Sequence, residues 1–481
     1  MSDYYRRKRY LCNNPNNYRS LRMLLPKLTY TVFILLSIII YSSCESDASI
    51  QPLPPEPAPK DSLSMPMDSL SIRVELPEKI YAVVDDELQL FFRGIVGAVN
   101  PYNYDILVTC PVGKKFPRYF TFTPSALDIG TYPFSITLRD DNGRKVGYAE
   151  SIIEVVEETD DAVLNILIFG DSLTSNGIWC HHANNRLTCS ANFCGPQETD
   201  GTHYFGQGGW KWESYTTASI PALRFEIETQ EPISVGSIYE DESGNNYTVL
   251  EVNVTSTIGS ILTSSKRYDC LPGSPNGYLS KVNGTGAQTI HYTDFHSDVA
   301  NPLWVDNHLT FQPYISKYVS GKPDILYVLL GWNDIKPWQT DFSDIEEHIR
   351  VFCTTLHHEY PAAKIRLMGL QIPSINGGIG NNYGATGSGY ADNYGLCHTV
   401  LNLNRFYQDL SCKIGDYVGF INISCQFDSE YNMPAQEYPV NSYNPTTETI
   451  GTNGVHPNIY GYYQIGDAVY RDICGLSYKT K

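Results

Sequence analysis

The stretch that most restricts the fold of this chain is Asn165–Thr174, with the sequence Asn-Ile-Leu-Ile-Phe-Gly-Asp-Ser-Leu-Thr. Its four consecutive apolar residues, Ile166 to Phe169, are typical of a strand covered on both faces, as in a parallel sheet. Gly170 permits a sharp turn after this strand, and the turn would lift the hydroxyl of Ser172 out of the sheet. Ligands of open α/β sheets bind at this carboxyl edge, so Ser172 is the candidate nucleophile. An ordinary strand-to-loop turn is the alternative, because Gly, Asp and Ser are common turn residues.

Length and charge limit the number of domains and the kinds of partner. The 481 residues exceed what one hydrophobic core usually supports, which predicts two or more domains. The net charge of −18 argues against nucleic-acid partners, because binding to phosphate backbones depends on clustered Lys and Arg. The 36 Tyr and 6 Trp side chains suit stacking on sugar rings and sheet packing equally.

The N-terminal segment, residues 1–44, has the pattern of an export signal. An apolar run from Leu28 to Tyr41 follows a cluster of Lys and Arg and is shorter than the roughly 20 apolar residues of a membrane span. It ends in Tyr-Ser-Ser-Cys44, which resembles the lipobox of bacterial lipoproteins, although Tyr41 replaces the usual aliphatic residue. The resemblance implies acylation of Cys44 and an extracytoplasmic protein anchored to a bacterial membrane, at the outer membrane or cell surface. An uncleaved signal anchor is the alternative.

Two further expectations concern the same end of the chain. A start at Met23 instead of Met1 would give a signal of ordinary length, and we expect the later start. Residues 45–70 contain the Pro-rich run Gln51–Pro59 and are predicted to form a stiff tether that holds the folded part off the membrane.

Ten cysteines follow the signal segment, and nine of them lie in the C-terminal part of the chain. Because nine is odd, at least one thiol there is unpaired or pairs outside that part. Cys180, Cys189 and Cys194 lie close to His181 and His182, but without the CxxC spacing of a zinc site. A loop disulfide or buried thiols are favoured over zinc, and no metal or cofactor is expected.

Residues 71–158 are predicted to form a small all-β domain. Three stretches have the period-two alternation of half-buried antiparallel strands, namely Ile72–Leu76, Leu88–Phe92 and Tyr132–Leu138. Asp140–Gly143 predicts a turn, and Asp128–Tyr132 resembles the tyrosine corner of immunoglobulin-like sandwiches, with Phe134 where antibodies have a cysteine. The resemblance implies a bacterial immunoglobulin-like module that is a spacer or binds carbohydrate. We favour the spacer, whose removal would leave turnover on a small ester nearly intact.

Three stretches beyond Ser172 carry groups that an acyl-transfer site requires. The glycines of the first let a backbone N–H, that of Gly209, approach an oxyanion. The second is another apolar strand, and it ends near the side-chain amide donor Asn333. The third opens a helix and contains His456, the candidate base. Taken singly, they fit a glycine turn, a helix N-cap and a structural histidine. In chain order the stretches are Gly206–Trp210, Asp324–Asp334 and Asn453–Asn458.

Together, the order Gly-Asp-Ser-Leu, Gly-Gly, Gly-x-Asn-Asp and x-x-x-His-Pro-Asn resembles the SGNH (GDSL) hydrolases from about Val163 to Leu476. The resemblance implies an α/β fold with a flavodoxin-like doubly wound parallel sheet for residues 162–478. Residues 364–370 and 417–423 fit further strands, and helical periodicity at 345–356 and 400–410 agrees with this architecture. A β-rich insertion is predicted at about 213–320, either as a substrate-binding lid, which we favour, or as a decoration remote from the chemistry.

One position departs from the family pattern. Asn453 stands where these hydrolases usually have an aspartate, three residues before the histidine. An aspartate would hold the imidazole in the correct tautomer and stabilise its cation, whereas an amide carries no charge. Three interpretations remain: a Ser-His pair oriented by Asn453 or a backbone carbonyl, a carboxylate supplied from elsewhere, or a weakened enzyme that mostly binds.

We therefore predict a lipid-anchored serine esterase that uses no cofactor. His456 would deprotonate Ser172 for attack on an ester, and the backbone N–H groups of Ser172 and Gly209 with the Asn333 amide would hold the oxyanion. The predicted substrate is an O-acetylated carbohydrate, by analogy with glycan-degrading surface enzymes. The alternatives are a lipase or acylhydrolase acting on lipid esters and a weakly active or non-catalytic glycan-binding protein. The predicted substrate-binding residues are Asp171, Trp210 and Trp332.

Overall fold

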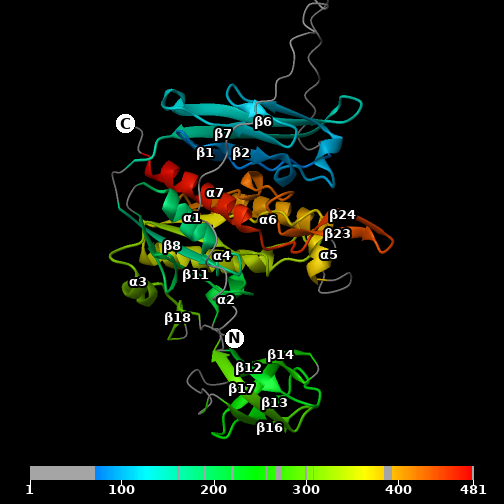
Figure 1. Cartoon of the computed structure of the whole chain (residues 1–481). Coiled ribbons are helices and arrows are strands. Elements are labelled where there is room, and N and C mark those ends of the chain that lie inside the picture. Colours follow the sequence, from blue (N-terminus) through cyan, green and yellow to red (C-terminus); the bar gives the residue numbers. More distant parts are fainter. Residues whose placement is uncertain are drawn as a thin grey trace, which may run out of the picture. The chain divides into compact units, whose positions relative to one another are not determined.

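The computed structural model describes residues 71–159, 163–188, 191–217, 222–255, 257–265, 274, 276–297, 301–306, 308–383 and 393–478. They form a two-sheet β-module (residues 71–156), an α/β domain and a β-barrel inserted in the α/β domain (Figure 1). The predicted signal segment with Cys44 and the Pro-rich tether lie outside the described residues.

The α/β domain is organised around a seven-stranded sheet. Its strands are β8 (Leu164–Gly170), β9 (Ala191–Cys194), β10 (Gln197–Thr199), β11 (Thr202–Gly206), β20 (Ile325–Leu329), β21 (Lys364–Met368) and β22 (Val418–Ile421). The strands β11, β8, β20, β21 and β22 are parallel neighbours in that order. When these five strands alone are numbered along the chain, their order in the sheet is second, first, third, fourth, fifth. This is the order of flavodoxin-like sheets, so the predicted topology is confirmed. Residues Ile166–Phe169 are fully buried, as their apolar run predicted.

Seven helices are described in the α/β domain. They are α1 (Ile178–Arg186), α2 (Trp212–Thr216), α3 (Gln312–Tyr318), α4 (Ser343–Glu359), α5 (Gly378–Tyr383), α6 (Asn393–Ile414) and α7 (Ile459–Ser477). The predicted helices at 345–356 and 400–410 fall within α4 and α6, and α4 buries Ile345, Ile349, Phe352 and Leu356 at the spacing of one helical face. Helix α7 packs on α1 and also contacts strands β1 and β7 of the β-module (Figure 1).

The β-module consists of two sheets around one core, with strand orders β1-β7-β6-β3 and β2-β5-β4. Its strands are β1 (Lys79–Val83), β2 (Leu88–Phe91), β3 (Asp105–Thr109), β4 (Lys114–Lys115), β5 (Tyr119–Phe122), β6 (Gly130–Arg139) and β7 (Lys145–Val156). The predicted turn joins β6 to β7, with Gly143 at φ +73° and its N–H donating to Asp140 O at 2.8 Å. The hydroxyl of Tyr132 donates to Asp128 O at 2.9 Å, which is the contact of a tyrosine corner.

One strand prediction in the β-module was wrong, and a second was one residue too long. Within Ile72–Leu76 only Val74 forms a bridge, to Val96, and the first strand is β1. The predicted second strand ends at Phe91, because Phe92 begins the 3₁₀-helix η2 (Phe92–Gly94). The described residues contain three further short 3₁₀-helices, η3 (Pro101–Asn103), η4 (Ala126–Asp128) and η5 (Ser424–Gln426). A Cβ at Gly94 would lie 1.8 Å from Ser424 O, so close packing on the α/β domain overrides the alternating pattern here.

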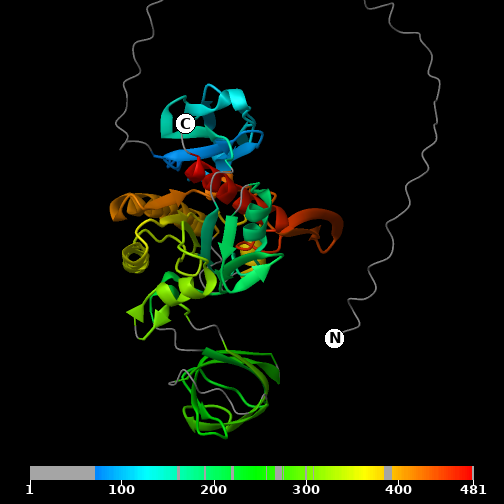
Figure 2. The same cartoon turned by 90° about the vertical axis from the view of Figure 1, so that its left-hand side faces the viewer.

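The predicted β-rich insertion is a closed six-stranded barrel in the order β12-β15-β14-β13-β16-β17, which Figure 2 shows nearly end-on. Its strands are β12 (Ala222–Glu228), β13 (Ile238–Glu240), β14 (Asn246–Thr255), β15 (Ile258–Ser265), β16 (Gly277–Asn283) and β17 (Thr289–Ser297). The predicted turn at 241–246 lies between β13 and β14, with Gly244 at φ +82°. Closure pairs every strand edge, and the barrel has its own apolar core.

Two small hairpins complete the described chain, β18 (Trp304–Val305) with β19 (His308–Leu309) and β23 (Ala435–Asn441) with β24 (Asn444–Gly451). The second precedes the His456 segment and was not predicted. Of the helices in the described residues, none has both the length and the apolar character needed to span a bilayer.

Candidate active site

Ser172 lies in a tight turn directly after β8. Asp171 Oδ1 accepts a hydrogen bond from the N–H of Leu173 at 2.9 Å, and Asp171 O accepts from the N–H groups of Thr174 and Ser175 at 3.0 Å each. A Cβ at residue 170 would lie 2.0 Å from Thr174 Oγ1, so the turn requires glycine there. The strand and this turn fix the position of the Ser172 hydroxyl at the carboxyl edge of the sheet.

His456, which lies near the C-terminal end of the domain's sequence, contacts that hydroxyl. Its Nε2 lies 2.8 Å from Ser172 Oγ, although 284 positions separate the two residues. Burial lowers the pKa of the imidazole below its usual 6.5, so the ring is mostly neutral at pH 7. A neutral imidazole whose Nε2 carries no proton can accept the serine proton at this distance, which is the arrangement that nucleophilic attack requires.

The glycine segment lies beside Ser172, and the Asn333 segment contacts the glycine segment. A Cβ at Gly208 would lie 3.9 Å from Ser172 Cβ, and the next residue, Gly209, has φ +79°. The Asn333 Nδ2 atom donates to Trp210 O at 2.9 Å, which fixes the amide and leaves its second N–H for an oxyanion. Asp334 Oδ1 accepts from the N–H of Trp212 at 3.2 Å. The Asn-Asp pair therefore holds the glycine segment through two contacts.

Asn453 does not present an acceptor to the imidazole ring of His456. Its Oδ1 accepts from the backbone N–H groups of Val455 and His456 at 2.9 Å each, so the amide nitrogen must face the ring. That Nδ2 lies 3.5 Å from His456 Nδ1. An N–H donor facing Nδ1 favours the tautomer protonated on Nε2, which cannot accept the Ser172 proton. Asn453 thus shapes the turn but opposes the tautomer that catalysis requires.

No carboxylate orients the His456 ring in the described part of the chain, where none forms an ion pair with His456. Within these residues, the site is a Ser172–His456 pair without an acidic third member. Of the three interpretations of Asn453, a carboxylate from elsewhere finds no support among the described residues.

Two predicted substrate-binding residues require correction. Asp171 is fully buried, and its Oδ1 is occupied by the N–H of Leu173, so it supports the turn instead of contacting a substrate. Burial, with the nearby charge of Asp334, raises the pKa of Asp171 to about 7. Trp332 is only 2% exposed and packs in the main core, so its ring is inaccessible to a substrate. Trp210 is partly exposed, with its ring edge-on to Tyr215 at 4.8 Å, and stays a predicted contact.

Residues that the sequence did not single out also support the histidine. Gln371 Nε2 donates to Val455 O at 2.9 Å, and the N–H of Ser374 donates to Gly454 O at 3.0 Å. Both follow β21 at the same carboxyl edge as Ser172. The sequence feature that could have identified these two residues is their position shortly after a predicted strand.

Two of the three cysteines near His181 lie within the described residues. Cys180 and Cys194 are buried thiols, while Cys189 lies outside the described residues. Among the described residues, no group of three or more His, Cys, Asp or Glu side chains could hold a metal ion.

A serine paired with a neutral imidazole at the carboxyl edge of a flavodoxin-like sheet is the arrangement of a serine hydrolase of the acyl-transfer type. The model of the GDSL-like lipase/acylhydrolase family matches residues 166–469, which is more than half of the chain and spans every segment of the site. The chain belongs to the GDSL-like lipase/acylhydrolase family, and it is an ester-hydrolysing enzyme.

Solved structures with some similarity include a carbohydrate esterase family 3 from Talaromyces cellulolyticus, with 13% identity, 65% of this chain and 98% of that chain covered, and a TM-score of 0.31. A family two carbohydrate esterase from Clostridium thermocellum, in complex with cellohexaose, has 12% identity, 81% and 91% coverage, and a TM-score of 0.29. A putative platelet activating factor structure from Streptococcus pneumonia has 11% identity, 66% and 86% coverage, and a TM-score of 0.31. No curated protein matches this chain.

The geometry of Asn453 predicts that Asn453→Asp is more active than the wild type. One carboxylate oxygen would keep the bonds from Val455 and His456, and the other would accept from His456 Nδ1–H. A hydrogen bond to a charged group contributes about 1.5–3 kcal/mol, so kcat should rise roughly tenfold or more. The new charge also raises the pKa of His456, which moves the acid limb of the kcat/KM profile to higher pH.

Asn441→Asp is the matched control, because Asn441 Oδ1 likewise accepts two backbone N–H bonds, from Tyr443 and Asn444, without a histidine nearby. Its kcat should not change. If Asn453→Asp leaves both kcat and the acid limb where they are, another acceptor already holds His456 Nδ1.

Proposed function

We propose that this enzyme removes O-acetyl groups from carbohydrate through an acyl-enzyme on Ser172. The observation that carries the proposal is the 2.8 Å contact between Ser172 Oγ and His456 Nε2. His456 takes the serine proton as Ser172 attacks the ester carbonyl, and gives it to the sugar oxygen as the ester C–O bond breaks, so that the sugar leaves with a free hydroxyl. The N–H groups of Ser172 and Gly209 with the Asn333 amide stabilise the oxyanion, and water then releases the acid.

Exposed aromatic side chains in the segments that carry the site residues, or in contact with those segments, support a carbohydrate substrate. Trp338 follows Asn333 by five residues and is 52% exposed, at a strained φ of +62° that its N–H contact with Gly395 O maintains. Tyr460 follows His456 by four residues, and the carbonyl of Tyr431 accepts from the amide of Asn458; both rings are exposed. Flat, rigid rings suit the apolar faces of sugars.

A cavity of about 630 Å³ beside Trp338 offers a place for the sugar chain. Tyr394, His398, Ile372 and Ile375 of the α/β domain line it together with Arg73, Arg93 and Val96–Val99 of the β-module. Ser172 and His456 are not among its lining residues. Two loops connect it to the site: the one that carries Asn333, and the one whose Gln371 and Ser374 bind the backbone before His456.

We also propose that the enzyme is exported and anchored through acylated Cys44, as its N-terminal sequence indicates. The β-module is proposed to be immunoglobulin-like. The Tyr132–Asp128 contact and the parallel pairing of its first and last strands, β1 and β7, support that assignment.

The proposed activity predicts acetate release from an O-acetylated polysaccharide such as acetylated xylan, together with faster hydrolysis of p-nitrophenyl acetate than of p-nitrophenyl dodecanoate. Ser172→Ala should lose at least about 10³-fold in kcat, because it removes the nucleophile. Both are measured on detergent-solubilised full-length protein. Faster hydrolysis of the dodecanoate would indicate lipid esters as the substrate. If the wild type releases acetate no faster than Ser172→Ala, the protein is a glycan-binding protein and not an esterase.

Trp338→Ala should raise KM for the acetylated polysaccharide about tenfold, because it removes one stacking platform. Its kcat/KM for p-nitrophenyl acetate should stay within twofold of the wild type, since that substrate is too small to reach the cavity. Tyr443→Ala, a change of an exposed ring at the tip of the β23–β24 hairpin, is the control and should affect neither substrate. Equal KM values for Trp338→Ala and wild type would exclude the cavity as the sugar site.

A further inference from the structure

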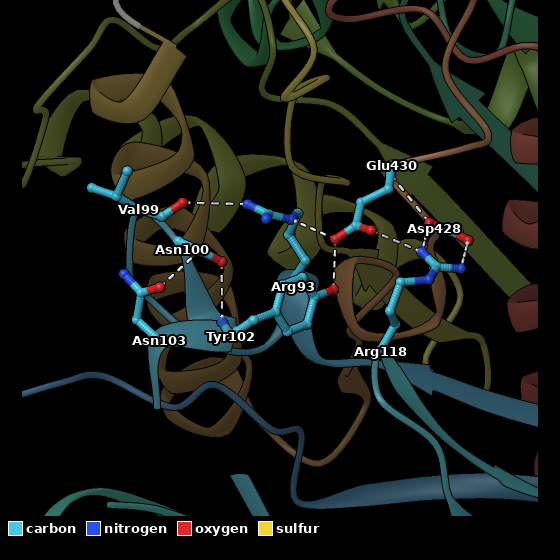
Figure 3. Close-up of polar contacts among 8 residues, drawn as sticks. All are labelled: Arg93, Val99, Asn100, Tyr102, Asn103, Arg118, Asp428 and Glu430. Atoms are coloured by element: carbon cyan, nitrogen blue, oxygen red, sulfur yellow. Dashed lines mark hydrogen bonds and ion pairs between the residues drawn. The ribbon is translucent and has the colours of Figure 1, made fainter. Parts of the chain in front are cut away.

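The β-module binds the α/β domain at the loop that leads toward the catalytic histidine (Figure 3). Arg118 donates to Asp428 Oδ1 and Oδ2 at 3.1 and 2.9 Å, and its Nη1 also donates to Glu430 Oε2 at 3.0 Å. Arg93 Nε donates to Glu430 Oε1 at 2.8 Å, and the hydroxyl of Tyr102 donates to the same oxygen at 2.5 Å. Two arginines and a tyrosine of the β-module thus hold two acids of the α/β domain.

The two acids depend on these contacts. The side chain of Asp428 is only 10% exposed and that of Glu430 only 13%. The N–H of Glu430 donates to Asp428 Oδ1 at 3.1 Å, so the two carboxylates are close neighbours. Burial opposes the charge of Glu430, but the hydrogen bonds from Tyr102, Arg93 and Arg118 hold its pKa below the usual value. Without the arginines, two adjacent and poorly hydrated carboxylates would repel each other.

From these acids, a chain of hydrogen bonds runs to the start of α7. The N–H of Asn432 donates to Asp428 O at 2.9 Å, and the N–H of Asn458 donates to Asn432 O at 3.1 Å. Asn458 Nδ2 donates to Tyr431 O at 3.2 Å, while its Oδ1 caps α7. The N–H of Asp428 also donates to Gln464 Oε1 of α7 at 2.9 Å.

Asn458 is separated from His456 only by Pro457, whose ring restricts the backbone. The 428–433 loop is therefore hydrogen-bonded to the chain only two residues after His456.

We infer that Arg118, with Arg93 and Tyr102, positions His456 against Ser172 by fixing the 428–433 loop, so that the β-module is part of the catalytic apparatus and not a spacer. The inference rests on the proposed acyl-transfer roles of Ser172 and His456. It replaces the expectation that turnover survives removal of the module, and it explains why α7, which follows His456, also packs against β1 and β7.

The test is Arg118→Met in the full chain, which removes the charge and keeps most of the apolar stem. A misplacement of about 1 Å at a catalytic group can lower the rate by about 10²-fold. We expect kcat for p-nitrophenyl acetate to fall roughly 10- to 100-fold with KM within twofold, and Arg118→Lys to recover part of the loss. The acid limb of the kcat/KM profile should move to higher pH, because a loosened His456 is less buried.

Arg144→Met is the matched control. Arg144 is also an arginine of the β-module with a carboxylate partner, but it pairs with Asp140 inside the β6–β7 turn. Its kcat and pH profile should equal those of the wild type. An Arg118→Met protein with native near-ultraviolet circular dichroism and unchanged kcat would overturn the inference.

The rate of Ser172 labelling by a fluorophosphonate separates this inference from the substrate assignment. If the wild type is labelled but hydrolyses no acetyl ester, the proposed substrate fails, whereas slower labelling of Arg118→Met still supports the positioning role. Should Arg118→Met not fold, Tyr102→Phe removes a single hydroxyl and should slow labelling severalfold. Equal labelling rates for Tyr102→Phe and wild type would contradict the inference.

Discussion

The contact of 2.8 Å between Ser172 Oγ and His456 Nε2 joins the end of the first strand of the sheet to the segment before the last helix. Both ends must be fixed independently for such a contact to persist. The serine is fixed locally, by the glycine turn and the buried Asp171 carboxyl. The histidine is fixed from three directions: by the turn at Asn453, by the loop after β21, and by the 428–433 loop that the β-module holds.

The absence of an acid from this pair, within the described residues, gives the position of His456 more importance. In a triad, the aspartate selects the tautomer and holds the ring. Here the amide nitrogen of Asn453 faces Nδ1 of His456, so no acceptor stabilises the tautomer that is protonated on Nδ1. The orientation of the imidazole then depends on packing and on the surrounding loops. This dependence gives a physical reason for the contacts that Arg93, Tyr102 and Arg118 of the β-module make with the 428–433 loop.

Local sequence signals predicted the parts of this structure that local physics determines. The apolar run of β8, the glycine turn, the helix capped by Asn458 and the Tyr132 corner each depend on residues within a few positions, and each lies where it was predicted. The orientation of the Asn453 amide could not be predicted, because it follows from which backbone N–H groups reach Oδ1. Likewise, the sequence does not distinguish a buried tryptophan from one that is exposed and could stack on a sugar. Only the three-dimensional packing shows that Trp332 is buried and that Trp338 is exposed.

The contact between Arg118 and Asp428 lay beyond sequence reasoning for a different reason. The two residues are 310 positions apart, and surface arginines and acids occur throughout the chain. The same holds for the closed barrel, whose strands were predicted as a β-rich insertion but whose closure depends on the long-range pairing of β12 with β17.

The most direct test of this account is to stop the reaction of the wild-type enzyme with p-nitrophenyl acetate by acid within the first turnovers and to map the acetylated peptide by mass spectrometry. The account predicts an acetyl group on Ser172 that accumulates when hydrolysis is slowed, and no such adduct in His456→Ala under the same conditions. Acetylation of a different residue, or turnover without any covalent adduct, would contradict the assignment of Ser172 and His456 as the catalytic pair.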